Sequence, residues 1–227
     1  RSKNKLKMKR PIITVAIDSP AAAGAGTQAK LISKEYNLLY LDTGKIYRVI
    51  GKLRLERKYK FNYNSVKSKI ANIRINDLSN KNLLSNEVAN SASIIAKDLK
   101  IRKLVKNFQI NCAYNPPGNF KGSILDGRDI TSVIMKNAMF KFYITANLKV
   151  RSTRRFLELK KIDKNISFNS VLKSLRNRDY LDKNRKHSPL KKTKDSILIN
   201  TSKLSKKACF NKIKRIMDRK LKIDGNL

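Results

Sequence analysis

Cysteine and histidine are scarce in this sequence. Its 227 residues include two cysteines and one histidine. Cys112 and Cys209 do not have the spacing of metal ligands, and two cysteines do not make a disulfide framework in a chain of this length. The sequence therefore indicates a reducing compartment, and we expect a cytoplasmic protein. His187 falls in a predicted loop, where we expect a surface role rather than a catalytic one.

Long apolar runs are also lacking. The apolar run behind the basic residues 1–10 is about seven residues long and ends at Asp18, too short for the apolar region of a signal peptide or for a membrane span. We therefore expect residues 1–10 to form a solvated tail, and we expect no membrane partner. A remnant of an organelle-targeting segment is the alternative for this tail.

Acidic residues are few, since 16 stand against 53 basic residues and give a formal charge of +37. Such a charge by itself suggests a polyanionic partner such as nucleic acid. However, the lysines are dispersed along every segment together with abundant Asn and Ile, and none of the usual nucleic-acid recognition motifs is present. We therefore expect non-specific adhesion to nucleic acid at low salt rather than a cognate nucleic-acid partner.

Short apolar runs alternate with helical patterns along the chain. The runs predict buried strands at 12–17, 38–41, 123–125, 140–146 and 197–199. Helical spacing of apolar residues predicts helices from near 26 to 36 and at 86–97, 101–113, 148–161, 167–180 and 205–220, with a further helix that carries Tyr47 and Arg48. Strands that alternate with helices make a doubly wound α/β fold, and the length fits one such domain with a subdomain insert.

The segment after the first strand has the length and end pattern of a phosphate-binding loop. The pattern G-x-x-x-x-G-K-[ST] places backbone N–H groups and a helix N-terminus around a phosphate. Ser19 replaces the first glycine, and Ala25 takes the position of the lysine that normally reaches the β- and γ-phosphates. We therefore expect the shape of the loop without its usual point charge. The predicted loop comprises Ser19, Pro20, Ala21, Ala22, Ala23, Gly24, Ala25, Gly26 and Thr27.

Three further blocks accompany this loop: LDTGKIYR at 41–48, LDGRDI at 125–130 and RDYLDKNR at 178–185. In this order and at this spacing, the blocks resemble those of the bacterial-type cytidylate kinases of the P-loop nucleoside monophosphate kinase family. The resemblance runs from about Pro11 to about Asp218. It implies that a monomer transfers the γ-phosphoryl group of ATP to CMP or dCMP with Mg²⁺.

The same resemblance implies a domain organisation. A kinase-like domain at 11–221 would have a five-stranded parallel sheet and a core at 11–60 and 98–221. An insert at about 61–97 would bind the nucleoside monophosphate, and a lid region would span about 151–190. Residues 222–227 would form a tail.

The resemblance also implies roles for individual residues. Ser93, Arg102 and Asp129 match positions that contact cytosine, where a carboxylate would accept a hydrogen bond from the N4 amine. The residues that match positions around the α-phosphate are Thr43, Arg48, Arg128 and Arg185. Arginines suit such positions because a forked guanidinium group can donate two hydrogen bonds to phosphate oxygens. The remaining matches are Arg178 and Asp182, at the ribose or the transferring phosphoryl group, and Arg154 and Arg155 in the lid. Ordinary surface ion pairs and a solvated helix face are the alternatives for these charged residues.

In the implied mechanism, the loop amides hold the β-phosphate, Thr27 contacts Mg²⁺, and Asp126 acts on the magnesium side through water. Arg128, Arg178 and Arg185 would neutralise charge on the transferred group. Because Ala25 removes the lysine, three hypotheses stay open. The first is a working (d)CMP kinase, slowed or assisted by another cation such as Lys45. The second is a protein that binds CMP without turnover, and the third is a basic nucleic-acid-associated protein on a kinase scaffold.

Overall fold

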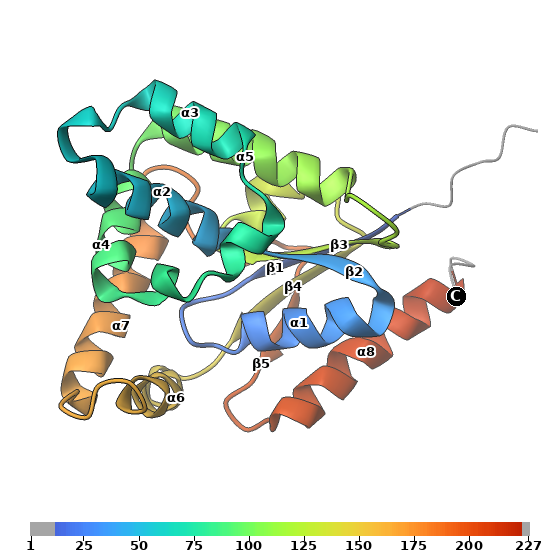
Figure 1. Ribbon diagram of the computed structural model, residues 1–227. Helices are drawn as coiled ribbons and strands as arrows, with labels where there is room; N and C mark the ends of the chain where they lie inside the picture. The colour runs from blue at the N-terminus through green and yellow to red at the C-terminus, as the bar shows by residue number, and fades with distance from the viewer. Residues whose placement is uncertain (1–11, 224–227) are drawn as a thin grey trace, which may run out of the picture.

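The structure, a computed structural model, describes residues 12–223, apart from the side chains at positions 59, 76, 79, 81, 84, 86, 89 and 223. Its centre is a five-stranded sheet in the order β2-β3-β1-β4-β5, in which every neighbouring pair is parallel (Figure 1). The strands are β1 (Ile13–Asp18), β2 (Leu38–Asp42), β3 (Gly122–Gly127), β4 (Phe140–Thr145) and β5 (Ile197–Asn200). The five-stranded parallel sheet and the α/β class expected from the sequence are thus confirmed. Because the strands are parallel, their carboxyl ends share one edge, where ligands bind in sheets of this kind.

Helices cover both faces of the sheet, because successive residues of a strand point to opposite faces and here both are apolar. On one face, Val15 and Ile17 of β1 pack in a core with α1 (Ala25–Tyr36) and α8 (Lys206–Ile223). On the other face, Ala16 packs in a second core with α2 (Thr43–Arg57) and α5 (Leu99–Tyr114). Figure 1 shows the two helix pairs on opposite sides of the sheet.

The segment expected as the insert, about 61–97, lies over α2. It contains α3 (Tyr63–Ala71), two 3₁₀ turns (Ile75–Ser79 and Lys81–Leu84) and α4 (Asn86–Ile95). Gly51 of α2 permits close contact with α4, because a Cβ added there would lie 2.7 Å from the backbone nitrogen of Ala92. The hydroxyl of Ser91 donates to the carbonyl of Gly51 at 2.9 Å. This contact fixes the segment to the core.

A buried ion pair joins α6 (Leu148–Lys160), α7 (Phe168–Asn184) and the segment after β1. The side chain of Arg151 on α6 is 5% exposed and forms two hydrogen bonds with Asp179 on α7, one of which joins Nη1 to Oδ1 at 3.0 Å. The same guanidinium group donates to the carbonyl of Ala21 at 3.0 Å and to that of Ala146 at 2.9 Å. This network satisfies the arginine inside the protein and holds the helical pair beside the loop that follows β1 (Figure 1).

The predicted strands are all present, with ends within two residues of those expected. Helix α7 continues to Asn184, past the expected end at 180, and α8 continues to Ile223, past the boundary at 221 expected for the domain. A π-helical turn at Ile130–Ile134 was not predicted. The expected tail at 1–10 lies outside the described residues. None of the described helices combines the length and the hydropathy that a membrane span requires.

We expect Asp179→Asn to lower the free energy of unfolding by about 3–5 kcal/mol, because it leaves the buried Arg151 without its counter-charge. The matched control is Asp195→Asn, because Asp195 pairs with Lys141 at 2.6 Å but its side chain is 62% exposed. The control should lose less than about 1 kcal/mol. Urea unfolding of both variants measures the difference, and equal losses would contradict a structural role for the buried pair.

Candidate active site

Three acidic side chains lie where neighbouring strands end. Asp18 is the last residue of β1, Asp42 is the last residue of β2, and Asp126 precedes the last residue of β3. The register pairs Asp42 with Asp126 and Asp18 with Gly127. The carboxyl edge of the sheet is therefore the place where charged groups converge.

The loop between β1 and α1 leads into the N-terminus of α1. Ala22 has a φ of 60° and Gly24 has a φ of 93°, so both lie in the left-handed region. Gly24 is the N-cap of α1 and has no side chain to bond the first N–H groups, and no acidic residue occupies the first turn. A helix N-terminus without such partners is suited to bind a phosphate group.

Two side chains from other elements hold the carbonyl groups of this loop. Arg151 donates to Ala21, and the hydroxyl of Thr201 donates to the carbonyl of Ala23 at 3.0 Å. Arg154 in turn donates to the hydroxyl of Thr201 at 2.9 Å and to its carbonyl at 2.8 Å. Arg154 therefore holds Thr201, which in turn holds the loop. The role of Arg154 in a lid stays a prediction.

Two neighbouring positions of the loop, Ala25 and Gly26, face different surroundings. Ala25 is 4% exposed and packs in the core beneath α1. Gly26 faces the acidic edge, because a Cβ added there would lie 3.2 Å from the hydroxyl of Tyr40 and 3.4 Å from Oδ2 of Asp126. Thr27, expected to contact Mg²⁺, is exposed on the next position of the helix. The loop residue beside the Asp126 carboxylate is thus Gly26, and the magnesium contact of Thr27 stays a prediction.

Asp126 has the surroundings of a cation ligand. Loss of hydration raises its pKa well above the usual range, and the neighbouring charge of Asp42 raises it further. The hydroxyl of Tyr40 donates to Asp126 Oδ1 at 3.2 Å, and the hydroxyl of Thr43 donates to the Asp126 carbonyl at 2.8 Å. Two repelling carboxylates at a phosphate loop fit a divalent cation with oxygen ligands, which would relieve their repulsion. Among the described residues, no group of three or more His, Cys, Asp or Glu forms a self-contained metal site.

Arginines crowd the same edge. Arg128 pairs with Asp182 of α7 through Nε at 2.8 Å. The side chain of Arg178 on α7 reaches solvent, but the protein atoms around its guanidinium group displace part of its water. This desolvation first, and the charge of Arg128 second, lower the pKa of Arg178 to about 10. Desolvation also lowers the pKa of Arg48, which donates to the carbonyl of Leu83 at 2.7 Å. Positive charges that destabilise one another indicate a site for an anion such as phosphate.

A second charged cluster lies beside a cavity of about 240 Å³. Arg102 of α5 donates to Asp129 at 2.7 Å, and Arg185 lies 3.9 Å from the same carboxylate. The Nη2 atom of Arg185 is buried and has no hydrogen-bond partner, so a donor is available to a ligand. The guanidinium group of Arg102 lies over the ring of Tyr47 at 5.9 Å, and burial raises the pKa of Tyr47 to about 12. A carboxylate, donors and an aromatic ring together could bind a polar heterocycle.

Most of the residues expected in the site come together at this edge. Ser93 lies on α4 and is exposed. Arg155 pairs with Glu158 at 3.1 Å, and its positive charge helps to lower the pKa of Arg178. The sequence did not single out Tyr47 as a site residue, although it falls within the LDTGKIYR block. The cavity is lined by Tyr47, Arg102, Lys106, Gln109, Asp129 and His187, among others.

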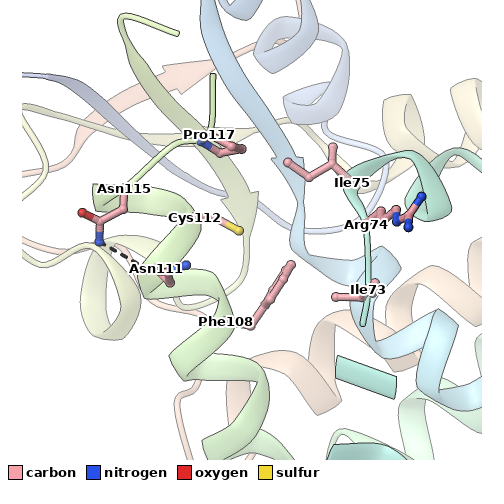
Figure 2. A pocket seen from close by; sticks show the side chains of 8 residues that line it. All are labelled: Ile73, Arg74, Ile75, Phe108, Asn111, Cys112, Asn115 and Pro117. Atoms are coloured by element: carbon pink, nitrogen blue, oxygen red, sulfur yellow. Dashed lines mark hydrogen bonds between the residues drawn. The ribbon is translucent and has the colours of Figure 1, made fainter. Parts of the chain in front are cut away.

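A larger hollow of about 440 Å³ lies elsewhere (Figure 2). It is lined by apolar side chains such as Phe108 and Ile73, with the amides of Asn111 and Asn115. Burial raises the pKa of the Cys112 thiol there to about 11, so this cysteine is a protonated, unreactive group at neutral pH. Arg74 supplies a positive charge to the lining of this hollow, but among the described residues that line it there is no carboxylate and no reactive nucleophile. The hollow is therefore a poor candidate for a catalytic site.

Comparison with known proteins identifies the relatives of this chain. A family described as cytidylate kinase matches residues 15–219. A cytidylate kinase of Clostridium botulinum strain Langeland is 36% identical over 220 residues, which cover 91% of this chain and 98% of the relative. A cytidylate kinase of Bartonella henselae is 39% identical over 199 residues, which cover 86% of this chain and 90% of the relative.

Among solved structures, an uncharacterized protein from Eubacterium ventriosum has the same fold. Its TM-score is 0.54 at 15% identity, with 91% of this chain and 98% of that chain covered. The family match and the curated relatives extend over almost all of the described residues, and they include the phosphate loop and the arginine cluster. The chain therefore belongs to the cytidylate kinase family of phosphotransferases.

Proposed function

We propose that this chain transfers the γ-phosphoryl group of ATP to CMP or dCMP. The observation that carries the proposal is the Arg102–Asp129 pair, at 2.7 Å, beside a cavity and next to an arginine cluster at the carboxyl edge of the sheet. Cytosine presents an amine donor and ring and carbonyl acceptors, so a carboxylate and a guanidinium group together match its edge. The named activity of the curated relatives supports the same assignment.

Each part of the edge has a task in this reaction. Asp129 would accept from the N4 amine of cytosine, and Arg102 and the Nη2 atom of Arg185, which makes no hydrogen bond within the protein, would donate to acceptor atoms. Arg48 and Arg128 would bind the α-phosphate and so orient its attacking oxygen. Arg178 would neutralise charge on the transferred group, because its position among like charges favours an anion.

On the ATP side, the N-terminus of α1 would bind the β-phosphate with its N–H groups. Asp126, with Asp42 beside it, would hold Mg²⁺ directly or through water. The metal would supply positive charge that offsets the charge of the phosphate oxygens. No nucleophile of the protein is needed, because the substrate oxygen attacks the phosphorus atom directly.

The alanine at position 25 favours a second candidate function. A Walker lysine is a preorganised charge, and loss of one such group costs roughly 10²- to 10³-fold in rate. Ala25 is buried, so the loop has an apolar contact at the position of the missing charge. A protein that binds CMP but transfers phosphate slowly or not at all is therefore the alternative.

A coupled assay with ATP, Mg²⁺ and CMP separates the two candidates. We expect measurable turnover with CMP at high enzyme concentration, at a rate lowered by the absence of the lysine. Calorimetry under the same conditions should detect CMP binding. Binding without turnover would support the alternative, and absence of both would contradict the cytidine nucleotide site.

The variant Ala25→Lys tests the loop itself. We expect kcat to rise by about 10²-fold, because the added ammonium group would lie at the N-terminus of α1 beside the phosphate site. Ser33→Lys is the matched control, since it adds the same charge to the same helix about two turns further on. An unchanged kcat in a folded Ala25→Lys protein, or an equal rise in the control, would contradict this explanation.

A further inference from the structure

Asp18, the last residue of β1, is completely buried and does not bond to the phosphate loop that follows it. Its two carboxylate oxygens accept three hydrogen bonds, all from residues 130 and 131. The backbone N–H of Ile130 donates to Oδ1 at 2.7 Å, and the backbone N–H of Thr131 donates to Oδ2 at 2.9 Å. The hydroxyl of Thr131 also donates to Oδ2. The side chain of Asp18 thus binds the short segment that follows the neighbouring strand β3.

That segment directly follows the two charged residues of the candidate nucleotide site. Gly127, just before them, is held through its carbonyl by the backbone N–H of Ser19 at 3.2 Å. Arg128 and Asp129 therefore lie between two anchors, one supplied by Asp18 at the end of β1 and the other by Ser19, the next residue. The carbonyl of Asp129 further accepts from the backbone N–H of Val133 at 2.9 Å within the π-helical turn. The directions of the two side chains depend on these anchors.

The chemistry of the contact requires a carboxylate. Burial raises the pKa of Asp18 to about 6, which reflects the cost of removing this group from water. A carboxylate has two acceptor oxygens, so it can bond the N–H groups of Ile130 and Thr131 at the same time. An amide has one acceptor oxygen, and its NH₂ group would face one of these N–H donors. An uncompensated donor in a buried site is costly, so an amide would displace the segment.

We propose that Asp18 is a positioning residue that sets the orientation of the Arg128–Asp129 dipeptide and thereby the recognition of the cytosine base. The inference rests on the proposed function and adds a residue to it. Because Asp18 also immediately precedes the phosphate loop, one side chain fixes the relative position of the nucleobase cluster and the phosphate loop.

The test compares Asp18→Asn and Thr131→Val with a matched control. Thr131→Val removes only the hydroxyl bond and is the milder variant, which keeps the test informative if Asp18→Asn does not fold. The control is Thr14→Val, because Thr14 is also buried on β1 and its hydroxyl accepts from the backbone N–H of Met139 at 2.9 Å, near the opposite end of the strand. Calorimetry measures the dissociation constants of CMP, UMP and ATP. Hydrogen exchange measures how fast the backbone amides of residues 128–134 exchange with solvent.

We expect Asp18→Asn to raise the CMP dissociation constant about tenfold and to lower the preference for CMP over UMP, with a change of less than about twofold for ATP. Thr131→Val should give a smaller rise of about two- to threefold in the CMP constant. Exchange of residues 128–134 should accelerate in both variants and stay unchanged in Thr14→Val.

Three results would overturn the inference. The first is unchanged CMP binding and base preference in folded variants of Asp18 or Thr131. The second is equal weakening of CMP and ATP binding, and the third is an effect of Thr14→Val on CMP binding as large as that of the Asp18 and Thr131 variants. If the unaltered protein does not bind CMP, the proposed function fails first, and this role fails with it. Failure of the variants alone leaves the proposed function intact.

Discussion

The removal of several arginines from water at the carboxyl edge of the sheet is the constraint that the rest of the site must satisfy. Desolvation and neighbouring positive charge lower the pKa values of Arg48, Arg178 and Arg185. The aspartates of the edge offset part of this charge, since Asp129 and Asp182 each bind an arginine at hydrogen-bond distance. The folded protein already holds the remaining positive charge in place. This preorganised charge would favour the binding of phosphate groups. A substrate with several phosphate oxygens would offset the cost of removing these charges from water.

Hydrogen bonds from side chains outside the loop hold the phosphate loop in its shape. The carbonyls of Ala21 and Ala23 are held by Arg151 and Thr201, and neither contact involves the position of the missing lysine. The shape of the loop and its usual charge are therefore separable in this chain. This separation explains how a member of the cytidylate kinase family can keep an anion-binding helix N-terminus while Ala25 packs in the core. In the proposed reaction, Arg178 of α7 and the acidic edge would then supply more of the charge stabilisation.

The strands could be predicted because each is a short run of apolar residues that is bounded by turn-forming or charged residues. The central strands β1 and β3 are buried on both faces, whereas the edge strand β5 buries only Ile199. The shared carboxyl edge followed from the parallel order. The contact between Arg102 and Asp129 could not be derived from spacing, because 27 residues separate them and only the resemblance pointed to it. The support of the loop by Arg154 through Thr201 was missed for the same reason. The extension of α7 to Asn184 was missed because its polar sequence has no apolar period, and tertiary ion pairs stabilise it instead.

A crystal structure of the chain with CMP would show whether the cytosine base binds at the Arg102–Asp129 pair. We expect the cytosine amine within hydrogen-bond distance of the Asp129 carboxylate and the phosphate group between Arg48 and Arg128. The phosphate oxygen that attacks ATP should face the N-terminus of α1. A nucleotide bound with its base away from Arg102 and Asp129, or in the hollow beside Cys112, would contradict this expectation.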